Sequence, residues 1–156
     1  AFAARPLQGV VGIVAAMTAS SLPRTDSVVD RFLAAICAGE PMAAADLYVP
    51  EVTLDAVVPG WRFSVSGADA VVAEYGRWFG APGSVDELRR LPTADGEVLE
   101  YTLQWEESGV PHGARHVHLL SIDRDADRIT TDHVWCGGRW PADLLAQMGA
   151  AAAVGE

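Results

Sequence analysis

Near the start of the chain, apolar residues recur every three or four positions, which is the period of an amphipathic helix. Ser27, followed by Asp30 three residues later, fits a capping box, and Gly39 supplies a stop. We therefore predict a first helix between Ser27 and Gly39. Its apolar face consists of Val28, Val29, Phe32 and Ile36.

Two further helices and a strand are predicted before residue 81. The segment "PMAAADLYV" begins with proline, is rich in alanine and favours a short helix that ends before Pro50. "EVTLDAVVP" is typical of a strand, and "GWRFSVSG" then serves as a connecting loop. "ADAVVAEYGRWFG" places Val71, Tyr75 and Trp78 on one face, which indicates a third helix that closes at Gly80.

From residue 84 the pattern changes to alternation, interrupted by the turn signals "ADGE", "ESGVPHG" and "DRDADR". It predicts four strands of an antiparallel meander, at 84–91, 97–106, 114–122 and 128–136. "CGGRWPADLLAQM" then leaves the sheet for a short helix. Helices that precede a long antiparallel sheet predict an α+β domain, in which N-terminal helices pack on a strongly curved sheet and enclose a conical pocket.

The length of 156 residues suits a single domain. We assign this domain to residues 25–148 and expect flexible tails at 1–24 and 149–156. The apolar run in "LQGVVGIVAAMTASSLP" is too short to span a bilayer. It fits either a signal peptide or residues upstream of a start at Met17, and both alternatives leave 1–24 outside the fold.

The composition narrows the possible partners and chemistry. The net charge is −10, and the eleven basic residues are all arginines scattered along the chain, so we expect neither a nucleic acid nor a membrane partner. The absence of lysine excludes Schiff-base chemistry and a phosphate-binding lysine loop. Two distant cysteines do not form a disulfide framework, which favours a cytoplasmic location, and the arginine- and alanine-rich composition suggests a bacterial source.

Residues 26–140 resemble the nuclear-transport-factor-like superfamily, which includes ketosteroid isomerases, SnoaL-like polyketide cyclases and scytalone dehydratases. The resemblance rests on "RFLAAICAGEPMAAADLYVPEVTLDAVVPG", "SGADAVVAEY" and "RITTDHVWCGG". It implies a cone with a pocket for a small hydrophobic molecule, and a homodimer formed through the outer face of the sheet. Trp135, which faces away from Asp132, fits such an interface.

The resemblance also carries over some site residues. Tyr48 and Tyr75 match tyrosines of the isomerase pocket network, and His118 matches the acid that donates a hydrogen bond to the developing oxyanion. Phe32 replaces the oxyanion tyrosine, and Ala56 replaces the carboxylate base.

Two more positions depart from the family. Asp55 falls on the other face of the strand that carries Ala56, and Val134 replaces the acid of the cyclase and epoxide-hydrolase branches. These departures argue against steroid isomerisation, and they are also compatible with a loss of chemistry.

The remaining chemistry centres on His118 and Asp132. His116 and His118 stand two apart in an apolar strand and so share one face. Thr130, Asp132, Val134 and Cys136 share a face of the last strand, and the resemblance turns that face toward the pocket. We predict that His118 and Asp132 act as catalytic acid and base, with no cofactor and no metal.

Further side chains are candidates for substrate binding. Tyr101 and Trp105 lie on the apolar face of one strand, and Trp61 is expected at the pocket mouth because it lies on a loop. The full set of expected binding residues is Phe32, Tyr48, Trp61, Tyr75, Tyr101, Trp105, His116 and Val134. Each of these residues also fits a purely structural role, as a core residue or as a partner for a neighbouring strand.

Three other patterns do not support a site. "DRDAD" lacks the glycine and glutamate of a calcium loop. His133 points away from Cys136, so these residues with His116 and His118 do not make a zinc site. The glycines of "WCGGRW" allow a bend rather than binding a nucleotide, and Arg139 can anchor the last helix or a neighbouring carboxylate.

Two hypotheses follow from the sequence. The first is an isomerase, dehydratase or cyclase type of enzyme that uses acid–base chemistry on a small hydrophobic carbonyl or hydroxylated substrate. The second is a non-catalytic protein of the same fold, which binds a hydrophobic molecule or serves as an accessory subunit.

Overall fold

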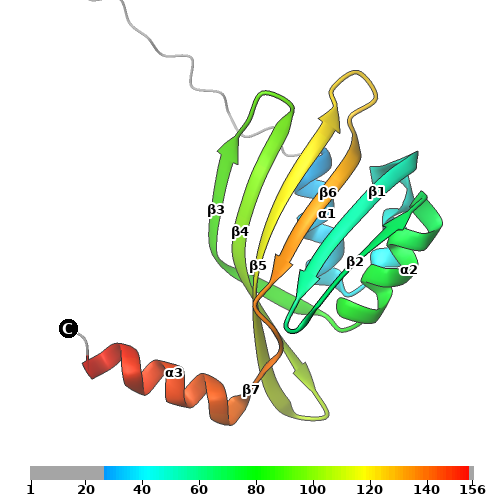
Figure 1. The fold of residues 1–156 in the computed structure, drawn as a ribbon. Coiled ribbons are helices and arrows are strands. Elements are labelled where there is room, and N and C mark those ends of the chain that lie inside the picture. Colours follow the sequence, from blue (N-terminus) through cyan, green and yellow to red (C-terminus); the bar gives the residue numbers. More distant parts are fainter. Residues whose placement is uncertain (1–26, 155–156) are drawn as a thin grey trace, which may run out of the picture.

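A computed structural model describes residues 27–154, and the expected N-terminal tail lies outside this range. Three α-helices and one 3-10 helix accompany a strongly curved mixed sheet of seven strands (Figure 1). The main path of the sheet follows the order β2-β1-β6-β5-β4-β3, and β7 pairs with β5. The predicted α+β architecture with a curved, mostly antiparallel sheet is therefore confirmed.

The N-terminal helices follow the predicted signals closely. Helix α1 covers Val28–Ala38, its capping box joins Ser27 to Asp30, and Gly39 ends it in the left-handed conformation at φ 68°. The second predicted helix is a 3-10 helix, η1, over Pro41–Leu47. Helix α2 covers Ala68–Trp78.

The strands that follow the helices were predicted closely. The observed strands are β3 at Gly83–Pro92, β4 at Gly96–Glu107, β5 at Val110–Asp123 and β6 at Arg128–Cys136. They pair antiparallel along the meander, as expected. Strand β1 at Tyr48–Val58 starts earlier than expected and pairs in parallel with β6, which brings the first strand beside the last long one.

The prediction of a loop over "GWRFSVSG" was wrong, because Trp61–Ser66 form β2, antiparallel to β1. Pro59 and Gly60 make the turn, and β2 is a short edge strand with only one neighbour. The apolar residues Trp61, Phe63 and Val65 alternate with polar ones directly after this turn, so the sequence did carry a strand signal here.

Helix α3 runs from Ala142 to Val154 and so continues beyond the boundary expected at residue 148. It follows the two-residue strand β7 at Trp140–Pro141 and projects from the body of the domain (Figure 1). Its contacts are with β5 and β7, and a Leu145 side chain lies over Gly113. Alanine favours helix strongly, which explains why the alanine-rich end continues the helix.

The core lies between the inner face of the sheet and α1, η1 and α2. The buried core residues are apolar apart from His116, His118 and Asp132. On β6 the expected inward face was wrong at one position. The pairing between β5 and β6 shifts after Ser121, which leaves Thr130 as an extra residue, and Ile129 is buried in its place.

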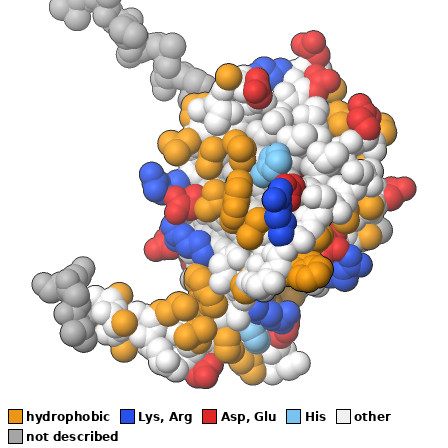
Figure 2. Space-filling model, in the orientation of Figure 1, with side chains coloured by type: hydrophobic (Ala, Val, Ile, Leu, Met, Phe, Trp, Pro, Cys, Tyr) orange, Lys and Arg blue, Asp and Glu red, His pale blue; other side chains and the backbone are white. Residues whose placement is uncertain are grey.

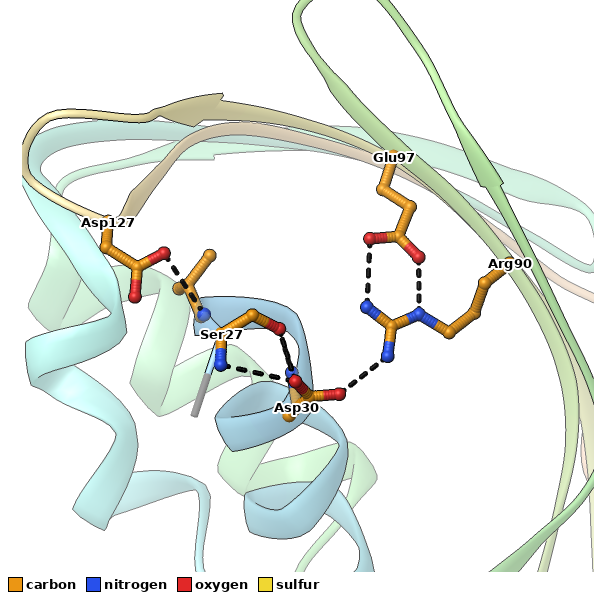
Figure 3. A network of polar contacts seen from close by, with 6 residues as sticks. Ser27, Asp30, Arg90, Glu97 and Asp127 are labelled. Atoms are coloured by element: carbon orange, nitrogen blue, oxygen red, sulfur yellow. Dashed lines mark hydrogen bonds and ion pairs between the residues drawn. The ribbon is translucent and has the colours of Figure 1, made fainter. Parts of the chain in front are cut away.

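Polar contacts fasten α1 to the sheet (Figure 3). The Arg90 guanidinium donates to Oδ1 of Asp30 at 2.6 Å and also to both carboxylate oxygens of Glu97 on β4. Burial opposes ionisation of Asp30, but the hydrogen bonds from Ser27 and Arg90 outweigh it and lower the pKa of this carboxyl. The same aspartate thus caps α1 and links it to β3.

Candidate functional site

Four side chains form a continuous hydrogen-bonded chain inside the core. Nδ1 of His118 lies 3.0 Å from Oδ1 of Asp132, and Nε2 of His118 lies 3.0 Å from the Tyr101 hydroxyl. The hydroxyl of Tyr75 donates to Oδ2 of Asp132 at 2.5 Å. The structure therefore brings the two predicted catalytic residues together and adds a tyrosine at each end of the pair. We call Tyr75, Asp132, His118 and Tyr101 the buried quartet.

Four elements assemble the quartet. His118 on β5 and Asp132 on β6 are on neighbouring antiparallel strands, Tyr101 comes from β4 and Tyr75 comes from α2. Both His118 and Asp132 have 0% of their surface exposed. A buried aspartate and a buried histidine are stabilised only if their polar atoms have partners, and the quartet supplies them.

The tyrosines of the quartet are neutral hydrogen-bond donors. Burial, reinforced by the nearby Asp132 carboxylate, raises the pKa of both Tyr75 and Tyr101 well above the usual phenol value. With Asp132 ionised, Nδ1–H of His118 donates to the carboxylate, and Nε2 accepts from Tyr101. Both nitrogens of His118 are thus occupied, and Nε2 can accept a proton only when the Tyr101 hydroxyl turns away from it, while Asp132 holds the orientation of the ring.

Aromatic and aliphatic side chains enclose the quartet. The Phe32 ring meets the His118 ring edge-on at 5.2 Å between centroids, and the Tyr101 ring stacks on it at 5.6 Å. Val134 is the register partner of His118 on β6. Phe32, Val134 and Tyr101 therefore surround His118 directly, in the positions where substrate contacts were expected.

A cavity of about 240 Å³ lies beside the quartet, beyond the rings of His116 and Phe79. Its apolar walls come from Trp78, Phe79, Leu103, Trp105 and Ala114. His116 and Cys136, which are register partners on β5 and β6, also line it. The cavity therefore begins two residues along these same strands from the His118–Val134 pair. The exposed guanidiniums of Arg77 and Arg139 mark its opening.

His116 is the buried polar residue of this cavity. It is 3% exposed, and its Nδ1 has no hydrogen-bond partner within residues 27–154. Burial, with the neighbouring His118, lowers the pKa of His116 to about 3, so the imidazole is neutral at physiological pH. The ring stacks on Tyr101 at 5.3 Å and meets Phe79 at 5.4 Å, and it therefore separates the cavity from the quartet.

Each arginine at the opening is paired with a carboxylate. Arg77 binds Glu74, which also accepts from the Trp78 indole at 2.9 Å. Arg139 binds Glu107 and lies 5.4 Å from the centre of the Trp105 ring. The expectation that Arg139 anchors a neighbouring carboxylate is thus confirmed, and the charges at the opening cancel in pairs.

Two of the expected binding residues lie elsewhere. Trp61 is 68% exposed at the start of β2 and does not line the cavity. Tyr48 is buried close enough to Asp132 to feel its charge, but it borders a shallow hollow beside Ser66 and Arg128. Among the expected residues, Trp105 and His116 line the cavity, and Tyr75, Tyr101, Phe32 and Val134 surround the His118–Asp132 pair.

Sequence reasoning missed Phe79 and Arg77, which sit at the C-terminal end of α2 and line the cavity. The available signal was the aromatic pair "WF" directly before Gly80, the residue at which the third helix was predicted to close. Asp55 and His133 lie on the outer face, where Asp55 binds Arg62, and take no part in the site.

Within the described residues, no three of the histidines, cysteines and acidic residues are grouped so that they could hold a metal ion. In the same part of the chain, no helix has the length and apolar character needed to cross a membrane.

Comparison with known proteins supports the fold. No protein-family model matches the sequence, and no curated protein matches it. Among solved structures, an NTF2-like protein from Anabaena variabilis superposes with a TM-score of 0.61 at 14% identity, covering 71% of this chain and 84% of that one. A protein from Bacillus subtilis described as a "putative isomerase" gives 0.58 at 13% identity, over 70% and 84%. The chain therefore has the nuclear-transport-factor-like fold.

Proposed function

We propose that this protein is a cofactor-free acid–base enzyme of the isomerase, dehydratase or cyclase type, acting on a small hydrophobic carbonyl or hydroxylated compound. The observation that carries the proposal is the hydrogen-bonded His118–Asp132 pair, held with both side chains fully buried. Apolar residues would stabilise the core as well or better, because burying a titratable pair costs solvation free energy.

The residues of the quartet suit proton transfer beside a carbonyl group. The His118–Asp132 pair removes a proton from the carbon next to the carbonyl and returns it to the product. For this step the Tyr101 hydroxyl turns from Nε2 of His118 to the substrate oxygen. The turn frees Nε2 to take the proton and places a neutral donor at the developing negative charge, while Tyr75 stays on Asp132. Tyr101 and Tyr75 both keep their protons, as their raised pKa values require.

A substrate reaches the quartet through the cavity. His116 and Phe79 form the layer between the two, and their rings contact each other at 5.4 Å. A substrate therefore reaches His118 only after these two side chains rotate.

The test is exchange of the α-protons of tetralone in deuterated water, followed by NMR. Wild-type protein should accelerate the exchange. The variant Asp132→Asn should slow it by roughly a hundredfold or more, which is the usual contribution of a positioned acid or base. Asp55→Asn on the outer face is the matched control and should keep the wild-type rate. Exchange that is equal in wild type and Asp132→Asn would reject the proposal.

The complete burial of His118 and Asp132 favours a second candidate function, a non-catalytic protein that binds a hydrophobic molecule in the cavity. In this case tetralone binds to the protein, but its α-protons exchange no faster than in a solution that contains no protein. The same experiment therefore separates the two functions.

We also propose that the protein is a homodimer that works in the cytoplasm. The outer face of the sheet carries an apolar patch formed by Val57, Val98, Val117, Leu119 and Trp135. Figure 2 shows hydrophobic side chains gathered on this face. Contiguous apolar surface of this kind is typical of a protein–protein interface. Cys37 and Cys136 are free thiols, which suits a reducing compartment.

A further inference from the structure

We propose that helix α3 is an exchanged arm, which in the homodimer packs across the outer face of the partner's sheet. This inference rests on the homodimer of the proposed function and names the element that completes its interface. The acid–base chemistry of the buried quartet does not depend on it.

Helix α3 has little packing of its own. Every residue from Ala146 to Ala153 is exposed, and the main contacts of the helix are with β5 and β7, next to its first turn. In Figure 1 the helix projects away from the sheet and from the other helices. A helix of 13 residues without tertiary packing is marginal in water, so α3 needs a surface to cover it.

The side chains of α3 are apolar almost throughout. Asp143 is its one charged residue, and Gln147 is its one uncharged polar residue. Leu144, Met148 and Ala151 recur at the spacing of a single helix face, and Met148 is 39% exposed. Helices that bind membrane surfaces carry lysine or arginine on their polar face, and α3 has neither, which favours a protein partner.

The helix begins on the outer face of the sheet. Gly113 and Leu119 are six residues apart on β5, so both point to the face opposite the buried His118. A methyl group of Leu145 lies over Gly113, 3.1 Å from the place where a Cβ would stand. Helix α3 therefore starts on the same face as the apolar patch, and Figure 2 shows hydrophobic side chains gathered on both.

A second copy of the chain covers both apolar surfaces at once. The apolar patch has five residues, whereas a stable interface uses roughly 20–30 residues on each side, so the patch alone is too small. Helix α3 is about 20 Å long at 1.5 Å per residue and extends the patch beyond the body of its own domain. In a twofold dimer each copy places its helix on the other, so the contact is made twice.

The charge of the chain favours the same partner surfaces. With a net charge of −10, two copies repel each other wherever charged surfaces meet. The apolar patch carries no charge, and α3 carries only that of Asp143. Contact between these two surfaces therefore brings the copies together with little repulsion.

The test is amide hydrogen exchange of the full chain, read by mass spectrometry. The dimer is compared with the monomer, which is obtained by dilution and by Leu119→Glu, a change that places a charge in the apolar patch. We expect the amides of α3 to exchange roughly tenfold or more slowly in the dimer, because packing opposes local opening of the helix. The amides of α1, which packs on the inner side of the domain, should exchange alike in both states.

A pair of variants tests which side of the helix is covered. Met148→Glu and Ala146→Glu add the same charge at exposed positions of α3, but on opposite sides of the helix. Met148→Glu should raise the Kd of the dimer roughly tenfold or more, since it replaces a buried apolar side chain by a carboxylate. Ala146→Glu should keep the Kd within about twofold of the wild type. Both positions lie outside the core, so neither variant disturbs folding of the domain.

A dimer in which α3 exchanges as fast as in the monomer overturns the proposal and leaves the homodimer standing, and so does an unchanged Kd in Met148→Glu. Slow exchange of α3 in the monomer also overturns it, because the cover then belongs to the same chain. A wild-type protein that is monomeric at every concentration overturns both the arm and the homodimer. Failure of the acid–base proposal is distinguishable, because it appears in the exchange of tetralone protons and not in the exchange of α3.

Discussion

At the residue scale, Tyr75 links a helix to the acid–base pair through one short hydrogen bond. Its hydroxyl lies 2.5 Å from Oδ2 of Asp132 in a fully buried setting. Tyr75→Phe removes this donor from Oδ2, which keeps only Nδ1 of His118 at 3.1 Å, while the ring packing is retained. We expect the free energy of unfolding to fall by roughly 1–3 kcal/mol, measured by urea denaturation.

The control for this variant is Tyr48→Phe. Tyr48 is also buried, but its hydroxyl makes no hydrogen bond within the described part of the chain. Its removal should change stability little. Equal losses in the two variants would show that Asp132 does not depend on the Tyr75 hydroxyl.

His116 makes the stability of the protein depend on pH. Its pKa is about 3 in the folded state against 6.5 as the ordinary value, so between these values the unfolded state binds more protons. The contribution of neutral His116 to the free energy of unfolding is therefore complete above about pH 6.5 and is lost as the pH falls toward 3. Between pH 7 and pH 5 the wild type should lose about 2 kcal/mol more than His116→Phe. Parallel stability curves for the two proteins would contradict the assignment.

The sequence predicted the face on which a residue lies where that face depends on a single strand. The two-residue spacing placed His116 and His118 on one face, and both are buried. The contact between His118 and Asp132 depends on the register between β5 and β6, and a one-residue shift would have removed it. The displacement of Thr130 arises from such a shift, which a single strand does not reveal.

At the element scale, helix α1 is positioned by its N-terminal cap. The Ser27 hydroxyl accepts from the backbone N–H of Asp30 at 3.2 Å, and the Asp30 carboxylate accepts from the backbone N–H of Ser27. Ser27→Ala should lower the free energy of unfolding by about 1 kcal/mol. Ser84→Ala, at an exposed position of β3, is the control and should have little effect. A cap that contributes nothing would give identical denaturation midpoints.

Local signals were enough to predict most elements, whereas the pairing of β1 was not predictable from them. Helix α1 and the strands β3 to β6 are bounded by caps and turns written in the local sequence. Strand β2 alternates in its own sequence and pairs with β1 across the turn at Pro59 and Gly60, so its signal was present and was overlooked. Strand β1 itself pairs in parallel with β6 from the far end of the chain. Pairing at that distance leaves no local pattern.

At the scale of the whole molecule, the proposed homodimer rests on the apolar patch on the outer face. Leu119 is 37% exposed and Trp135 is 46% exposed, on adjacent strands. Leu119→Glu places a charge in this patch and should convert a dimer into a monomer in light scattering. Val110→Glu, at the hairpin between β4 and β5, should leave the mass unchanged. A wild-type protein with the mass of one chain would reject the dimer.

The arrangement of the whole molecule also explains why the cavity was predicted only in outline. The curved sheet encloses the core as expected, but the position of the cavity is set by where α2 ends and where β6 turns out at Gly137 and Gly138. These two events bring Phe79 and Arg139 together from distant parts of the sequence. Tertiary contacts of this kind are absent from any single segment.

The central claim is that the cavity delivers a small carbonyl compound to the His118–Asp132 pair for proton transfer. The most direct measurement is the α-proton exchange rate of tetralone at saturating concentration, in wild type and in Asp132→Asn, with tetralone affinity measured in both. The account predicts similar affinities and an exchange rate roughly a hundredfold lower in the variant. Similar affinities with no protein-dependent exchange in either protein would contradict it and leave a binding protein.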